Sequence, residues 1–125
     1  MRTVLFIDDQ EEILWALKRI LRKESYEKIY TTSCKEALEI LEKQKVDVLI
    51  TDMLMPEMSG LELLEIVKSR YPDIVGVLLS GIAEKNEIDQ GLKKELIYKH
   101  ISKPWDDNAE VKRKIQEVID YCEVR

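Results

Sequence analysis

The sequence is poor in the features that mark secreted and membrane proteins. It has only two cysteines in 125 residues, Cys34 and Cys122, and their spacing fits neither a disulfide framework nor a metal site. No stretch approaches the roughly 20 apolar residues that a membrane-spanning helix needs. The N-terminus has four apolar residues followed by acids, which is not the pattern of a signal peptide. We therefore expect a cytoplasmic protein, and neither a secreted mini-protein nor a membrane protein.

An excess of positive charge is missing as well. The chain has 20 Lys and Arg against 25 Asp and Glu, which leaves a net charge of -5. This balance argues against direct binding of nucleic acid or of an anionic membrane. Apolar residues make up 45% of the chain, enough for one buried core at this length. The expectation is a single domain over residues 1–125, with no output domain after its last helix.

The order of apolar patterns predicts the fold class. Three strongly apolar stretches, typical of strands buried on both faces, occupy residues 3–7, 46–50 and 75–79. Residues 28–32 are less apolar, which favours an edge strand, and residues 97–101 form a short fifth strand. After four of these strands apolar residues recur at helical spacing, and a poorly patterned, charged helix is expected over about 85–94. Five strands alternating with five helices predict an α/β fold, a parallel sheet between two layers of helices.

Polar residues follow four of the predicted strands. They are Asp8-Asp9, Thr51-Asp52, Ser80-Gly81 and Lys103-Pro104. Because the carboxyl ends of parallel strands lie at one edge of a sheet, we expect three carboxylates, one hydroxyl and one amine to converge there. Crowded carboxylates repel one another unless a cation joins them, and an oxygen-only ligand set favours Mg²⁺. A carboxylate beside that metal can attack phosphorus to give an acyl phosphate.

The strand ends also carry a resemblance to a known family. They read FIDDQ, TDMLMPEMSG, LLSG and SKPW. Together these motifs resemble the receiver domain of two-component response regulators, and the resemblance runs from about Thr3 to the last helix. It implies a flavodoxin-like (βα)5 three-layer sandwich with strand order 2-1-3-4-5.

The resemblance also implies a role for each residue. Asp52 is expected to be the phosphoacceptor, with Asp9 and Asp52 as direct Mg²⁺ ligands. The backbone carbonyl of Leu54 would be a third ligand, and Asp8 would act mainly through water. Ser80 matches the family's switch hydroxyl.

Lys103 matches the family's lysine, which with Ser80 would bind the phosphoryl oxygens. By the same resemblance, a sensor histidine kinase or a phosphotransfer protein would supply the phosphoryl group. The chain would then switch conformation to control an unidentified output partner or domain, as a monomer or a phosphorylation-dependent dimer. It would not be a turnover enzyme. Leu54 and Ile82 are apolar and flank the expected phosphoryl site, so we predict that the phosphoryl group is lost only slowly.

Several residues have two interpretations. His100 stands where the family places an aromatic switch, and it is either an ordinary surface residue or a switch that titrates near pH 6.5. Trp15 is either an exposed residue that anchors a docked kinase or a residue of the core, and its apolar neighbours favour the core. Gly60 is expected to supply either a special backbone conformation or a close approach, and no chemistry. The Lys103-Pro104 bond is expected to be cis, by resemblance to the family.

Three other functions are compatible with this fold class. A flavin-binding protein would need a phosphate loop rich in glycine and hydroxyls after the first strand, where this chain has acids. A Mg²⁺-dependent phosphatase of the haloacid dehalogenase type would need an Asp-x-Asp pair and a cap, and both are missing. The third alternative is an interaction module that no longer becomes phosphorylated. The full set of acids, hydroxyl and lysine argues against it.

Overall fold

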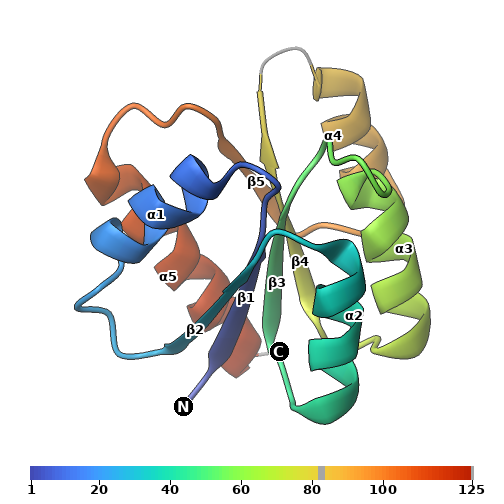
Figure 1. Cartoon of the computed structure of the whole chain (residues 1–125), viewed down its shortest axis with the longest axis horizontal. Helices are drawn as coiled ribbons and strands as arrows, with labels where there is room; N and C mark the ends of the chain where they lie inside the picture. Colours follow the sequence, from blue (N-terminus) through green and yellow to red (C-terminus); the bar gives the residue numbers. More distant parts are fainter. Residues whose placement is uncertain (82–83, 125) are drawn as a thin grey trace.

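The computed structural model describes residues 1–81 and 84–124, and within them five strands alternate with five helices (Figure 1). The strands are β1 (Thr3–Ile7), β2 (Glu27–Thr31), β3 (Val48–Asp52), β4 (Val75–Ser80) and β5 (Lys99–Ser102). The helices are α1 (Glu11–Ile20), α2 (Cys34–Lys43), α3 (Gly60–Arg70), α4 (Lys85–Lys93) and α5 (Asn108–Val124). Among the residues described, no helix combines the length and the apolar character needed to span a membrane.

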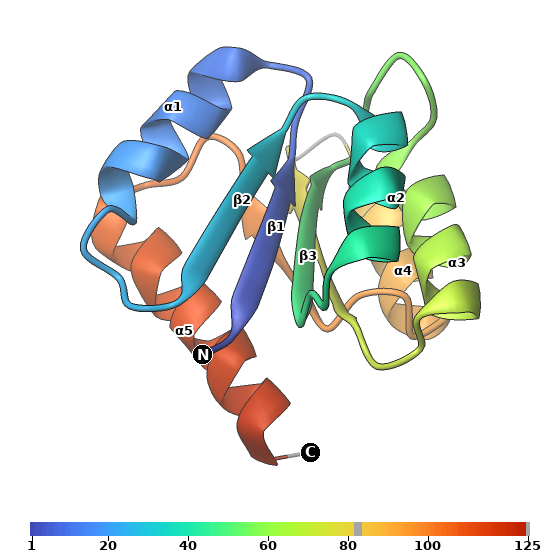
Figure 2. The same ribbon diagram turned by 60° about the horizontal axis from the view of Figure 1, so that its bottom comes forward.

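The strands form one parallel sheet in the order β2-β1-β3-β4-β5, as predicted. Helices α1 and α5 cover one face, and α2, α3 and α4 cover the other (Figure 2). Each face has its own hydrophobic cluster, because side chains alternate between the two sides of every strand. In β1, for example, Val4 and Phe6 pack toward α1 and α5, whereas Leu5 and Ile7 pack toward α2 and α3.

The burial of the strands follows their sequences. β1, β3 and β4 are buried along their whole length, whereas the edge strands β2 and β5 are only partly buried. Several predicted strand boundaries were wrong by one or two residues. The third strand starts at Val48, the first residue that pairs with β1, although Val46 before it is already buried in the core. Ile97 does not start the fifth strand, because its N–H donates to the carbonyl of Gly91 at the end of α4.

The start of α3 lies against the end of β3. Ser59 and Glu62 form a capping box at the N-terminus of the helix. A Cβ atom on Gly60 would lie 2.3 Å from the backbone oxygen of Asp52, which is far inside van der Waals contact. The predicted close approach at Gly60 is therefore confirmed, and it holds the loop after β3 next to Asp52.

The prediction that Trp15 belongs to the core was wrong. Trp15 is 60% exposed, while Leu14 and Leu17 on the same helix are buried. Successive residues of a helix point about 100° apart, so a residue next to Leu14 can face away from the sheet. The apolar neighbours of Trp15 in the sequence belong to the inner face of α1.

Candidate functional site

Three acidic side chains meet at the carboxyl end of the sheet. Asp8 and Asp9 directly follow β1, and Asp52 is the last residue of β3. One carboxylate oxygen from each of the three lies within 4.8 Å of the others. The predicted convergence of these residues is therefore confirmed.

Lys103 joins this group from the loop after β5. Its ammonium donates hydrogen bonds to Asp52 Oδ1 at 2.9 Å, Asp8 Oδ2 at 3.1 Å and Gln10 Oε1 at 3.3 Å. Burial lowers the pKa of Lys103, but the hydrogen bonds to Asp52 and Asp8 outweigh it, so the pKa is raised overall. The lysine therefore stays charged beside the carboxylates. The Lys103-Pro104 peptide bond is cis, as expected.

Asp8 is the most deeply placed of the acids. Its side chain is fully buried, and this burial raises its pKa, against the lowering effect of hydrogen bonds from the Gln10 N–H and from Lys103. A buried carboxylate with a second carboxylate beside it is stabilised by a cation. Since all the side-chain donors are oxygen atoms, the site suits a hard divalent ion such as Mg²⁺.

Ser80 ends β4 on the same edge of the sheet. It is 2% exposed, and its Oγ has no hydrogen-bond partner among the atoms the structure describes. Buried hydroxyl groups nearly always have a partner, because leaving one unsatisfied costs about 1–3 kcal/mol. The free hydroxyl therefore fits a group that binds a ligand oxygen.

A cavity of about 300 Å³ lies at the acidic site, next to Asp52 and Lys103. It is lined by Asp9, Gln10, Asp52, Leu54, Gly81, Glu84 and Lys103. Leu54 is 67% exposed at its mouth. Gln10 and Glu84 were not predicted as site residues: Gln10 stands in the FIDDQ motif but was given no role, and Glu84 belongs to no motif. Ile82, the other predicted flanking residue, lies outside the described residues.

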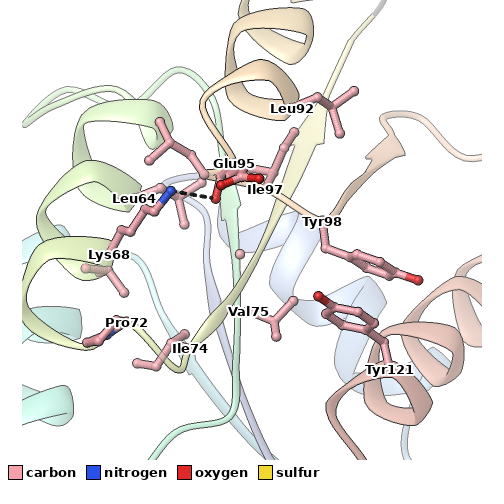
Figure 3. A pocket seen from close by; sticks show the side chains of 13 residues that line it. Leu64, Lys68, Pro72, Ile74, Val75, Leu92, Glu95, Ile97, Tyr98 and Tyr121 are labelled. Atoms are coloured by element: carbon pink, nitrogen blue, oxygen red, sulfur yellow. Dashed lines mark hydrogen bonds between the residues drawn. The ribbon is translucent and has the colours of Figure 1, made fainter. Parts of the chain in front are cut away.

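A second cavity, of about 480 Å³, lies at the opposite end of the sheet (Figure 3). Lys68 of α3 lies beside it and donates to the backbone carbonyls of Lys94 and Glu95 at 2.9 and 3.3 Å. The rings of Tyr98 and Tyr121 stack at one side, with their centroids 4.0 Å apart. This cavity borders the starts of β4 and β5, so it does not belong to the acidic site.

Comparison with known proteins agrees with the strand-end chemistry. The family model of the response regulator receiver domain matches residues 4–116. The chain belongs to this family. It is 37% identical over 103 residues to the hydrogenase transcriptional regulatory protein HoxA of Cupriavidus necator, covering 82% of this chain and 21% of HoxA. This receiver domain thus spans about a fifth of the length of that relative.

Other relatives match over most of their own length. Sporulation initiation phosphotransferase F of Bacillus subtilis is 31% identical over 104 residues, which are 82% of each chain. A CheY-like receiver domain protein from Methanospirillum hungatei superposes with a TM-score of 0.87 at 28% identity, covering 98% of this chain and 97% of that one. TrrA of Thermotoga maritima, solved in complex with Mg²⁺-BeF, has a TM-score of 0.79 at 25% identity, covering 94% of this chain and 99% of that one.

His100 lies on β5 of the receiver domain, opposite Leu78 of β4. It is partly buried, and its Nδ1 is buried with no hydrogen-bond partner among the described atoms. Burial, and after it the charge of Lys114, lowers the pKa of His100. The side chain is therefore held mainly neutral near pH 7. Its role as a switch stays a prediction.

Proposed function

We propose that this receiver domain accepts a phosphoryl group on Asp52 from the phosphohistidine of a sensor histidine kinase or a phosphotransfer protein. The observation that carries the proposal is that Asp52 contacts the partly buried Lys103 ammonium and lies close to two further carboxylates. Family membership supports the same role, since receiver domains are phosphoacceptors.

The transfer exchanges one bond to phosphorus for another. An oxygen of Asp52 attacks in line, and the bond from phosphorus to the histidine nitrogen breaks with its electron pair left on nitrogen. Lys103 and the Met53 N–H both hydrogen-bond Oδ1 of Asp52, so we assign Oδ2 as the attacking oxygen. Lys103 would then hold a phosphoryl oxygen, and the unpartnered Ser80 hydroxyl would donate to another.

The acidic residues fit Mg²⁺ as the cofactor of this reaction. Asp9 and Asp52 would bind the ion directly, with the backbone carbonyl of Leu54, and Asp8 would act mainly through water. The close approach of three carboxylates and the raised pKa of Asp8 support such a site. When bound, Mg²⁺ would neutralise the carboxylates and the charge on the phosphoryl oxygens.

The same proposal extends to the phosphorylated state of the domain. The domain would lose its phosphoryl group slowly and would not turn over a substrate. Movement of Ser80 toward the phosphoryl group, with His100 as a second switch residue, would carry the change to an output partner or domain. Transcriptional regulation is the activity of the much longer HoxA, and for this chain we propose only a cytoplasmic signalling role through protein contacts.

The test is direct phosphorylation. The chain is incubated with acetyl phosphate and Mg²⁺, and its mass is measured. We expect a gain of one phosphoryl group that is absent from Asp52→Asn and Asp52→Ala and unchanged in Asp89→Asn, a control on exposed α4. A gain that persists in Asp52→Ala contradicts the assignment. No gain in the wild type from either acetyl phosphate or a phosphorylated kinase supports a non-phosphorylated interaction module instead.

A further inference from the structure

Glu84 folds back onto the loop that follows β4. The N–H of Gly81 donates to Glu84 Oε1 at 3.2 Å and to Oε2 at 3.4 Å. Both residues line the cavity of about 300 Å³ that also contains Asp52 and Lys103. The carboxylate of Glu84 therefore accepts the hydrogen bond of a backbone N–H group in the wall of the proposed phosphoryl site.

The Gly81 N–H group, which donates to Glu84, is well placed to bind an anion. It directly follows Ser80, whose hydroxyl has no partner among the described atoms, and the Lys103 ammonium lies on the same cavity. Carboxylate and phosphoryl oxygens accept the same charge-assisted hydrogen bonds from N–H groups. A phosphoryl group on Asp52 would bring a competing set of oxygens to this wall.

We propose that Glu84 is an internal competitor for the phosphoryl group: it holds the Gly81 amide in the unphosphorylated protein and is displaced when Asp52 carries a phosphoryl group. This inference rests on the proposed function. The exchange opposes phosphorylation, because the incoming group must break the existing hydrogen bond and because Glu84 adds negative charge to an acidic cavity.

The displacement would also reach α4. Glu84 is the residue immediately before this helix, and its side chain makes no capping hydrogen bond to it. Once released from Gly81, the carboxylate is free to interact with the N–H groups at the start of α4, where negative charge is favourable. Phosphorylation would thus change the contacts of a helix that contributes no ligand to the site.

The experiment measures the affinity of the Mg²⁺-loaded protein for beryllofluoride, a stable mimic of the phosphoryl group. Glu84→Ala is expected to bind on the order of tenfold more tightly than the wild type, because a hydrogen bond to a charged group is removed from the unbound state. Glu84→Gln keeps an acceptor but loses the charge, so its affinity for beryllofluoride is expected to lie between those of the wild type and Glu84→Ala. Asp89→Ala on α4 removes one negative charge outside the cavity and is expected to leave the affinity unchanged.

The N–H resonance of Gly81 supplies a second measurement by NMR. It should differ between wild type and Glu84→Ala in the free protein and coincide once both are saturated with Mg²⁺ and beryllofluoride. A difference that persists in the saturated proteins shows that Glu84 is not displaced and overturns the inference. The inference is also overturned if wild type and Glu84→Ala bind beryllofluoride with equal affinity. It is overturned as well if Asp89→Ala raises this affinity as much as Glu84→Ala does. A wild type that binds no beryllofluoride instead contradicts the proposed function.

Discussion

The Lys103 ammonium donates a 2.9 Å hydrogen bond to Asp52 Oδ1, across 51 residues of sequence. Its second carboxylate contact, to Asp8, is at 3.1 Å. One positive charge thus faces two carboxylates. In the proposed function the same lysine would hold a phosphoryl oxygen and would compete with Mg²⁺ for the two carboxylates.

Replacing Lys103 should therefore strengthen metal binding. In Lys103→Ala, the carboxylates of Asp8 and Asp52 lose their cation, so we expect Mg²⁺ affinity to rise about threefold or more. A Mg²⁺ titration followed by isothermal calorimetry measures this. Lys112→Ala, an exposed change on α5, is the control. Weaker Mg²⁺ binding by Lys103→Ala would contradict the competition.

Removing the charge of Asp8 should stabilise the metal-free protein. Because burial raises its pKa in the folded state, ionised Asp8 opposes folding at neutral pH, and this penalty fades as the pH falls through the folded pKa. We expect Asp8→Asn to raise the thermal midpoint without metal by about 3–5 °C. Saturating Mg²⁺ should stabilise the wild type more than the variant. A lower midpoint for the metal-free variant would mean that Lys103 compensates the buried charge of Asp8 fully.

Gly60 should tolerate no side chain. In Gly60→Ala the new Cβ would lie 2.3 Å from the backbone oxygen of Asp52, so we expect a loss of about 2 kcal/mol or more in the free energy of unfolding. Gly81→Ala is the matched control, because its Cβ would meet nothing nearer than 3.7 Å. Urea unfolding measures both variants. Equal stabilities would mean that the backbone relaxes at Gly60.

Leu54 should slow the loss of the phosphoryl group. It is exposed at the mouth of the cavity and cannot orient a water molecule for attack. We expect Leu54→Asn to dephosphorylate on the order of tenfold faster, because its amide can hydrogen-bond that water. Leu92→Asn, at an exposed leucine of α4, should leave the rate unchanged. A wild-type phosphoryl half-life of only seconds would refute the prediction.

His100 should make stability depend on pH. Its pKa is lowered in the folded state, chiefly by burial, so the unfolded chain binds more protons as the pH falls below 6.5. The free energy of unfolding therefore decreases as the pH falls from the ordinary histidine pKa to the lower pKa of His100 in the folded protein. Thermal unfolding from about pH 8 to pH 5 should show this loss in the wild type and a smaller one in His100→Phe. Parallel profiles would assign the loss to other groups.

Much of the fold was predictable because it depends on local pattern. Strongly apolar stretches marked β1, β3 and β4, since strands covered on both faces are rich in apolar residues. The carboxyl ends of those strands then placed Asp8, Asp52 and Ser80 on one edge. The strand order came from the family resemblance and was confirmed.

The predictions that were wrong, and the contacts that were missed, depend on the direction in which a side chain points. Trp15 has apolar neighbours in the sequence, but the turn of α1 directs it to solvent. Glu84 belongs to no motif, and only the path of the chain brings its carboxylate to the Gly81 amide.

The sequence by itself determined the element order and the chemical types at the strand ends, because periodicity and residue identity are local properties. Only the tertiary structure decided that Lys103 contacts both Asp8 and Asp52, that the Ser80 hydroxyl is buried without a partner among the described atoms, and that Glu84 occupies the Gly81 amide. The Lys103 contacts depend on the distance between segments far apart in the chain, and the other two depend on the direction of a side chain, so none of them follows from residue type and spacing alone.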